Sequence, residues 1–256
     1  MVLKEALLNK PIIGGRAHSM EEVREVCSQG LPFVEISLDD PEGVEKDLQE
    51  LLAIKEYAKI DYLAHYPNEG NPFDPGSLRH EFVPKIKELL KLSYRLGIRK
   101  GTIHFWMDKR WAQHDLIMRK ISLLDEMVSY AETQGVVLCI ENLSERYDSF
   151  KPAFDAIPSL RMTLDIGHGQ LLARENTALG FIRNTFERIA HLHVHDNHGG
   201  KSVTDDEHLP LGEGIIDYPG ILHEIIKKGY DSTVTMEVKP MDMPKSCIYL
   251  KRVLAL

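Results

Sequence analysis

Seven apolar runs of this chain stop at a histidine, an aspartate or a glutamate. The seven junctions are Val34-Glu35, Ala64-His65, Ile103-His104, Ile140-Glu141, Leu164-Asp165, Leu192-His193 and Met236-Glu237. In a (β/α)8 barrel all the parallel strands open onto the same face, so polar residues at the strand ends are aimed at one point. The pattern therefore predicts a barrel that gathers ligands around a divalent metal ion.

Short β-rich segments alternate with longer segments of helical periodicity, which is typical of βα units around a parallel sheet. We predict strands over 11–17, 32–38, 61–66, 100–106, 136–142, 161–166, 190–196 and 232–239. Helices are expected to begin near Ser19, Val44, Leu78, His114, Ser149, Leu171, Tyr218 and Pro244. The length of 256 residues is close to the ~250 of a typical barrel. The predicted fold is therefore an α/β (β/α)8 TIM barrel with one domain, 1–256.

Local signals support several of these helices. Ser19 is followed three residues later by Glu22, which is the pattern of a capping box. Glycines stand where four helices should stop, at Gly30, Gly97, Gly135 and Gly229. We expect these residues to mark helix ends.

Charge and cysteine content restrict the class of partner and compartment. Lys and Arg total 31 against 39 Asp and Glu, a net charge of −8, and no basic block of the kind found in nucleic-acid or membrane-surface tails is present. Cys27, Cys139 and Cys247 are isolated and odd in number, which argues against a disulfide framework and for a reducing cytoplasm. The segment Met1–Lys10 is charged, and no run reaches the ~18 apolar residues of a membrane span. We expect a soluble, cytoplasmic protein.

Alternation along the strands assigns an inward and an outward face to each. In 233–239 the apolar parity is outward, and Thr233, Thr235, Glu237 and Lys239 are inward. The same sorting turns inward Thr102, His104, Trp106, Cys139, Glu141, Thr163 and Asp165. Because an unpaired buried carboxylate is costly, a bound cation would offset the cost of this lumen.

A stretch rich in histidine and acid follows the seventh strand, first over 191–198 and then over 206–214. Alternation puts His191, His193 and His195 on one face, so this pattern alone does not choose a metal ligand among them. We expect His195 and His198 to support the ligands or to face solvent.

The chain resembles the xylose isomerase-like barrel superfamily, which includes sugar isomerases and epimerases and the endonuclease IV branch of abasic-site nucleases. The resemblance covers nearly the whole chain and is carried by Ile140-Glu141-Asn142, Leu164-Asp165-Ile166-Gly167-His168, His193-Val194-His195-Asp196, Asp206-Glu207-His208, Gly212-Glu213-Gly214 and Glu237. It implies one divalent ion (Mn, Mg, Co or Zn) at the positions matching Glu141, Asp165, His193 and Glu237. It further implies that this ion polarises a sugar carbonyl and stabilises an enediolate, with Glu141 and Glu237 as the acid/base pair.

The endonuclease IV branch gives an alternative, a trinuclear-zinc phosphodiesterase that acts on abasic-site DNA. Its three zinc ions are held by matches to His65, His104, Glu141, Asp165, His168, His193, Asp206, His208 and Glu237, and all nine are present. Against it, the segment after His65 lacks the aromatic residue that probes DNA in that branch, and the second strand ends on Glu35 as in the isomerases. The sequence also shows no cluster of Lys and Arg near the expected mouth, which phosphate contacts would need. We therefore favour sugar chemistry over nucleic acid.

The resemblance also bears on the substrate, a small sugar or sugar phosphate. We expect contacts to it from Glu35, His168, Trp106 and Lys239. A third reading is a barrel that binds a sugar or a metal ion without catalysis. The metal count should be one for the isomerase and up to three zinc ions for the nuclease. The oligomeric state stays open in the sequence, although relatives of this kind often form homo-oligomers such as homodimers or homotetramers.

Overall fold

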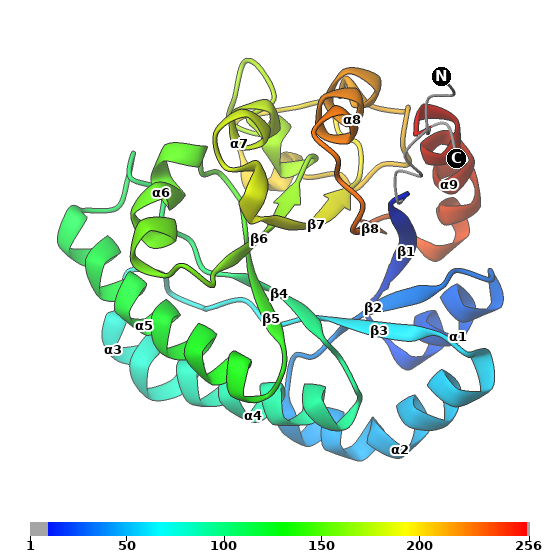
Figure 1. The fold of residues 1–256 in the computed structure, drawn as a ribbon, viewed down its shortest axis with the longest axis horizontal. Helices are drawn as coiled ribbons and strands as arrows, with labels where there is room; N and C mark the ends of the chain where they lie inside the picture. Colours follow the sequence, from blue (N-terminus) through cyan, green and yellow to red (C-terminus); the bar gives the residue numbers. More distant parts are fainter. Residues whose placement is uncertain (1–9, 255–256) are drawn as a thin grey trace, which may run out of the picture.

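Eight parallel strands form a closed barrel, in which each strand pairs with its sequence neighbours and β8 pairs with β1 (Figure 1). They are β1 (Ile12–Ala17), β2 (Phe33–Ser37), β3 (Asp61–His65), β4 (Lys100–His104), β5 (Val137–Glu141), β6 (Arg161–Asp165), β7 (Ile189–Val194) and β8 (Thr233–Met236). This computed structural model describes residues 10–254, so the expectation made for Met1–Lys10 falls, apart from Lys10, outside the described residues. The predicted TIM barrel is confirmed.

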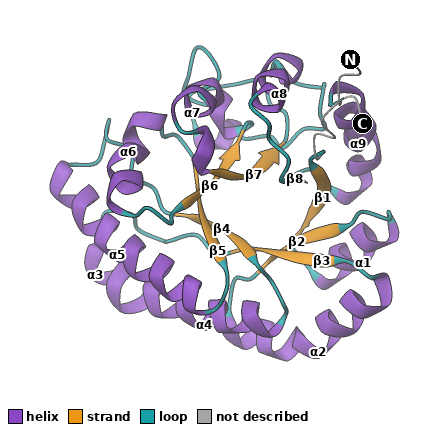
Figure 2. Ribbon diagram, in the orientation of Figure 1, coloured by secondary structure: helices purple, strands orange, loops and turns teal. Residues whose placement is uncertain are grey.

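Helices cover the outside of the barrel (Figure 2). They are α1 (Met20–Ser28), α2 (Pro41–Ala58), α3 (Pro75–Ser77), α4 (Val83–Arg95), α5 (His114–Thr133), α6 (Tyr147–Ala156), α7 (Ala178–Asn184), α8 (Tyr218–Lys227) and α9 (Met243–Val253). Short turns of other helical types are η1 (Leu78–Phe82), η2 (His168–Gln170), η3 (Phe186–Arg188), η4 (Val203–Asp205) and η5 (Pro240–Asp242). Within residues 10–254, no helix has both the length and the apolar character needed to cross a bilayer.

One predicted helix start is wrong. A helix was expected near Leu171, but α7 begins at Ala178. Leu172 has a positive φ of 53°, and Leu171 forms a β-bridge with Gly200, so the backbone cannot continue as a helix there. The side chain of Asn176 then accepts a hydrogen bond from the Ala178 N–H at 2.9 Å, which satisfies a free donor at the start of α7. The intervening loop lies at the carboxyl end of β6, beside the candidate site.

The predicted helix ends are confirmed. The Ser19 hydroxyl accepts the Glu22 N–H at 3.2 Å, and the Glu22 carboxylate accepts the His18 N–H at 2.6 Å. The four glycines at helix ends have φ of 72°, 68°, 66° and 91°, at Gly30, Gly97, Gly135 and Gly229 respectively. These left-handed conformations are ones that a residue with a Cβ rarely adopts.

The inward and outward faces of the strands also follow the predicted alternation. Phe105 points outward and stacks on Phe82 of η1, with ring centroids 6.0 Å apart. Thr102 and Thr163 point into the lumen, where their hydroxyls lie 2.8 Å apart. At the amino end of the barrel, the Lys100 ammonium donates to the Thr233 hydroxyl at 2.8 Å. Hydrogen-bonded polar side chains thus share the lumen with the ring of Phe33, whose centroid lies 6.3 Å from that of His191. All three cysteines are unpaired.

Candidate active site

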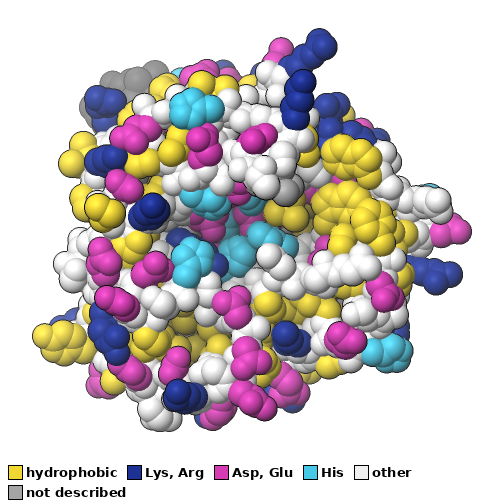
Figure 3. Space-filling view, turned by 180° about the vertical axis from the view of Figure 1, so that it is seen from behind, with side chains coloured by type: hydrophobic (Ala, Val, Ile, Leu, Met, Phe, Trp, Pro, Cys, Tyr) yellow, Lys and Arg dark blue, Asp and Glu magenta, His cyan; other side chains and the backbone are white. Residues whose placement is uncertain are grey.

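Four side chains from the carboxyl ends of neighbouring strands meet at one point in the lumen. Each offers a ligand atom within 4.8 Å of the others, from Glu141 of β5, Asp165 of β6, His193 of β7 and Glu237 just after β8. All four are buried. Seen from the side opposite Figure 1, histidine and acidic side chains gather in a hollow at the middle of the molecule (Figure 3). The structure therefore brings together the four residues that the sequence singled out for one metal ion.

The His193 ring lies at the centre of this group. Its Nδ1 is 2.8 Å from Glu141 Oε1 and 3.3 Å from Glu237 Oε1. Burial opposes protonation of His193, but the carboxylates of Glu237, Glu35 and Glu141 outweigh it and hold the pKa of His193 well above its ordinary value. Without a cation, a proton on Nδ1 therefore occupies the place that a metal ion would take.

The donor set fits a divalent cation. Asp165 Oδ2 is buried and, among the described residues, has no hydrogen-bond partner. Arg16 of β1 is 5% exposed and places its Nε 3.3 Å from Glu237 Oε1, so one cation already offsets part of the negative charge. Three carboxylates and one imidazole suit the borderline-hard divalent ions Mn, Mg, Co and Zn. Glu141, Asp165, His193 and Glu237 are therefore candidate metal ligands, as predicted from the sequence.

Two further histidines flank Glu141 on the opposite side from His193. His104 Nε2 is 2.8 Å from Glu141 Oε2, and His65 Nε2 is 3.4 Å from the same oxygen. Burial opposes ionisation of Glu141, but His193 and His104 hold the pKa of its carboxyl well below the ordinary range. The Glu141 carboxylate thus contacts His193 through Oε1, and His104 and His65 through Oε2.

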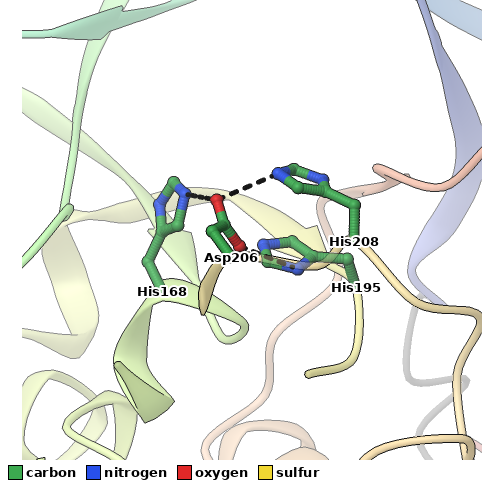
Figure 4. Close-up of side chains that lie close together, drawn as sticks. All are labelled: His168, His195, Asp206 and His208. Atoms are coloured by element: carbon green, nitrogen blue, oxygen red, sulfur yellow. Dashed lines mark hydrogen bonds and ion pairs between the residues drawn. The ribbon is translucent and has the colours of Figure 1, made fainter. Parts of the chain in front are cut away.

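A second cluster of His168, His195, Asp206 and His208 lies beside the first (Figure 4). Asp206 Oδ2 is 3.1 Å from His168 Nε2 and 3.0 Å from His208 Nε2. The His195 ring stacks on that of His208 with centroids 3.9 Å apart. Both ring nitrogens of His195 and the Asp206 Oδ1 are buried and lack a hydrogen-bond partner within residues 10–254. Their nearest charged contacts are longer than a good hydrogen bond, at 3.5 Å from His195 Nδ1 to Asp206 Oδ1 and 3.3 Å from His195 Nε2 to Asp165 Oδ1. Such unsatisfied atoms point to a ligand.

The charged groups of the second cluster shift one another's pKa values. Burial opposes the charged forms, but hydrogen bonds to Asp206 and the nearby carboxylates raise the pKa of His208 to about 9. The pKa of His168 also lies well above its ordinary value, because Asp165 and Asp206 outweigh the effect of burial. Hydrogen bonds from His168 and His208 in turn hold the pKa of Asp206 below its ordinary value against burial. A cation here would replace protons that the metal-free cluster carries.

The four expected substrate contacts lie at different depths. Trp106 is half-buried, and its indole N–H donates to the Ser144 hydroxyl at 3.0 Å. Lys239 is exposed, and both ring nitrogens of His168 already face protein oxygens. Glu35 has 0% exposure and lies against His193, so the expectation that it contacts the substrate directly is not supported by its position. Its carboxylate is used entirely inside the protein.

Sequence reasoning undervalued three residues of the site. His195 was expected to face solvent or to support ligands, yet it is fully buried and belongs to the second cluster. Its shared parity with His191 and His193 was the signal that placed it inward. Arg16 was not singled out, although it lies on the inward parity of β1 with Gly14. His191 is buried behind Glu35, with its Nε2 2.9 Å from Glu35 Oε2.

The structure also corrects the statement that Lys and Arg do not cluster near the mouth. A groove of about 1060 Å³ is lined by four exposed cationic side chains, from Arg146, Arg174, Arg183 and Lys201, and also by Asp148 and Glu175. It shares Leu172 with a cavity that His168 and Asp206 line. The four cationic side chains are far apart in the sequence and come from the loops that follow β5, β6 and β7, and from α7. Sequence proximity could not reveal this cluster, because the fold creates it.

Comparisons with known proteins agree with this architecture. The family model for xylose isomerase-like TIM barrels matches residues 23–253. The uncharacterized protein MJ1311 of Methanocaldococcus jannaschii is 25% identical over 228 residues, which cover 82% of this chain and 75% of that protein. Fructoselysine 3-epimerase of Escherichia coli O157:H7 is 25% identical over 139 residues, which cover 51% of this chain and 49% of that enzyme.

A solved D-tagatose 3-epimerase-like protein has the same fold, with a TM-score of 0.82 and 24% identity, over 95% of this chain and 97% of that chain. The names of that solved protein and of the Escherichia coli relative both refer to 3-epimerases. The family match spans almost all of the described barrel, including every residue of both clusters. The chain belongs to the xylose isomerase-like TIM barrel family.

Proposed function

We propose that this protein is a divalent-metal-dependent isomerase or epimerase of a sugar or sugar phosphate. The observation that carries the proposal is the meeting of Glu141, Asp165, His193 and Glu237 within 4.8 Å of one another. The set combines ligands for one ion with two glutamates that can exchange protons with a bound substrate. The names of the similar epimerases support the same reaction class.

A divalent ion held by these four side chains would polarise a substrate carbonyl and so make the neighbouring C–H more acidic. The proton itself is handled by the protein. Glu141 and Glu237 are ionised at neutral pH, because His193 outweighs burial and keeps the pKa of both carboxyls low, that of Glu237 at about 2. Either carboxylate can therefore accept a proton at an Oε atom.

The two glutamates approach His193 from different strands, β5 and the end of β8. A substrate carbon between them would have one carboxylate on each face. Removal of a proton by one glutamate, followed by delivery of another to the opposite face by its counterpart after that carboxylate has taken up a proton from solvent, would invert a carbon centre. Delivery of a proton to the neighbouring carbon would isomerise the sugar. The hydrogen bond from His104 to Glu141 and the contact of Arg16 with Glu237 fix the two acid groups in place.

The test is hydrogen exchange between substrate and D2O, followed by NMR with a panel of ketohexoses that includes D-tagatose. We expect Glu141→Gln and Glu237→Gln to lower the exchange rate by about 10²–10⁴-fold, the usual contribution of a general acid or base. Glu213→Gln, at an exposed carboxylate paired with Lys245, is the control and should keep the parent rate. Parent-rate exchange by Glu141→Gln would contradict the proposal, and loss of its folded structure by circular dichroism would show a structural role.

A second candidate is a trinuclear-zinc phosphodiesterase acting on abasic-site DNA. Two observations favour it over the non-catalytic reading. His65 and His104 lie beside Glu141, and His168, Asp206 and His208 form the second cluster, so all nine matching residues converge. The four cations of the neighbouring groove could also contact phosphates, which is the electrostatic feature that the sequence appeared to lack.

Metal content separates the two candidates. Elemental analysis of purified protein should give one ion per chain for the isomerase and three zinc ions for the phosphodiesterase. Asp206→Asn should leave a single-ion protein unchanged but lower the count of a three-ion protein, since Asp206 bridges His168 and His208. Incision of an abasic-site duplex by metal-loaded protein would support the phosphodiesterase, and its absence would remove that candidate.

A further inference from the structure

A cavity of about 570 Å³ opens next to the candidate metal centre. Its lining includes His104, His168 and Asp206 of the site and three aromatic rings, Phe73, Trp106 and Trp111, which we call the aromatic slot. Its volume lies in the range of roughly 300–1,000 Å³ that holds drug-sized ligands. A single sugar ring at the metal centre would therefore leave the aromatic slot unfilled.

The three rings form a continuous row. The centroids of Phe73 and Trp106 are 5.2 Å apart, and those of Trp106 and Trp111 are 6.5 Å apart, with the two indoles within 17° of parallel. Phe73 and Trp111 remain 56% and 52% exposed. Figure 3 shows hydrophobic side chains gathered beside the central hollow. Exposed aromatic surface of this kind at the edge of a pocket usually has a ligand.

The slot is held rigidly by buried charge. The backbone N–H of Trp106 donates to Glu69 Oε1 at 2.7 Å, and Glu69 Oε2 accepts from the Lys120 ammonium at 2.6 Å. The Lys120 ammonium lies 4.4 Å from the centre of the Phe105 ring, and Lys120 has 0% exposure. Burying an ion pair is costly, and here it holds the backbone of Trp106 in place, while the hydrogen bond from the indole N–H to the Ser144 hydroxyl orients the ring before any ligand arrives.

Several polar groups that border the slot already have protein partners, whereas Asp206 Oδ1, at the end next to the metal centre, has no hydrogen-bond partner within residues 10–254. Asn68 Oδ1 lies 2.6 Å from His104 Nδ1, and both Glu69 oxygens are used as described. The Ser144 hydroxyl accepts from Trp106 and donates to Asp108 Oδ2 at 2.9 Å. A second sugar ring would find few free partners for its hydroxyls beside the indoles, whereas a flat apolar ring needs none. The slot therefore selects for aromatic faces over hydrogen-bonding groups.

We propose that the substrate is a sugar that carries a planar aromatic group, and that the aromatic slot binds this group while the sugar occupies the metal centre. The inference rests on the proposed function for the place of the sugar. Two sources share this chemistry, an aryl glycoside and a nucleoside. Both compounds contain a planar ring, and the indoles of Trp106 and Trp111 can contact the face of that ring.

Tryptophan fluorescence gives a direct test, because Trp106 and Trp111 are the only two tryptophans of the chain. The full chain, loaded with diamagnetic Zn2+, is titrated with phenyl α- and β-D-glucopyranoside, uridine and adenosine, and with glucose, ribose and phenol as fragments. We expect at least one aryl-bearing probe to bind tenfold or more tightly than its free sugar and than phenol. The glycoside and nucleoside arms then identify the source.

Trp111→Ala should abolish this gain and change the affinity for the free sugar by less than twofold, with Trp106 as the remaining reporter. Tyr57→Ala, which removes a 92% exposed aromatic ring on α2, is the matched control and should keep the full gain. The proposal is overturned if no aryl probe exceeds its free sugar, if phenol alone binds as tightly as the glycoside, or if Trp111→Ala keeps the gain.

These experiments distinguish a failure of the aromatic-slot proposal from a failure of the proposed isomerase activity. Tighter binding of an aryl-bearing probe than of its free sugar, without any hydrogen exchange in D2O, would support the aromatic slot and count against the isomerase. Exchange on free sugars without an aryl gain would support the isomerase and overturn the aromatic slot.

Discussion

The carboxylate of Glu35 lies 3.0 and 3.1 Å from Nε2 of His193, on the side of the ring that faces away from Glu141 and Glu237. A carboxylate only accepts hydrogen bonds, so Nε2 carries a proton and Nδ1 is directed at Glu141 and Glu237, the proposed metal position. Glu35 also accepts from Thr235 Oγ1 at 2.6 Å and is fully buried. A carboxylate behind a ligating histidine fixes its tautomer and increases its basicity.

Glu35→Gln should therefore weaken zinc binding by about 10–100-fold, the usual effect of removing such a partner. The amide retains one acceptor oxygen, but it loses the charge and leaves one of three donors unsatisfied. Competition with a chromophoric chelator measures the affinity. Glu69→Gln is the control, since it also neutralises a buried carboxylate but lies away from the metal ligands, and it should leave zinc affinity unchanged. Equal losses in both variants would contradict the role of Glu35.

Metal loading should release about one proton per ion from His193 at neutral pH. His193 is doubly protonated without metal, because Glu237, Glu35 and Glu141 raise its pKa well above the ordinary value despite burial. The ion replaces the proton on Nδ1, so apparent affinity should rise about tenfold per pH unit until the pH exceeds the pKa of His193. Calorimetry in buffers of different ionisation enthalpy counts the protons. In the parent, the number of protons released should stay constant between pH 6 and 8. In Glu35→Gln, where His193 has lost one carboxylate that raises its pKa, the number should fall over this range. The opposite pattern would contradict this assignment.

Lys120 and Glu69 provide a test of the buried pair that supports Trp106. Lys120→Met should destabilise the protein by about 3–5 kcal/mol, because it leaves the Glu69 carboxylate buried without its cation. The double variant with Glu69→Gln should recover part of this loss, since the unpaired charge is gone. Urea unfolding followed by circular dichroism measures both.

Lys91→Met is the matched control for that experiment. Lys91 pairs with Glu88 on the surface, and its removal should leave the unfolding midpoint unchanged within error. If the double variant were less stable than Lys120→Met alone, the pair would not be the cause of the loss.

The strand ends of the site could be predicted from sequence because two local rules apply to them. Alternation with period two decides which side chains enter the lumen, and closure of the barrel brings all carboxyl ends together. Both rules are independent of loop structure. They suffice for Glu141 and for Asp165 and His193, which pair with each other beyond the register shift between β6 and β7 at Met162 and Thr163. They also suffice for Glu237, which continues β8 through the hydrogen bond of its N–H to Val194.

The second cluster depends on a loop, which sequence patterns do not determine. Asp206 and His208 return to the lumen because Leu209 pairs with Asp196 in an antiparallel bridge and His208 adopts a positive φ of 48°. Neither feature has a local signature. The depth of Glu35 was missed for a different reason, since alternation gives the direction of a side chain but not the layer of the barrel that it occupies.

Gly167 offers a final test, which links backbone packing to the second cluster. A Cβ at this position would lie 2.2 Å from the His195 ring, although its φ of −65° suits any residue. Gly167→Ala should therefore displace His195 from its stack on His208 and destabilise the protein by about 1–3 kcal/mol, as overpacking does. Gly43→Ala in α2 is the control, because its Cβ would meet only an ordinary contact at 3.7 Å, and it should be neutral or stabilising. Zinc titration of the two variants should show weaker binding only in Gly167→Ala if the second cluster holds an ion, and parent stability in that variant would mean that His195 is free to move.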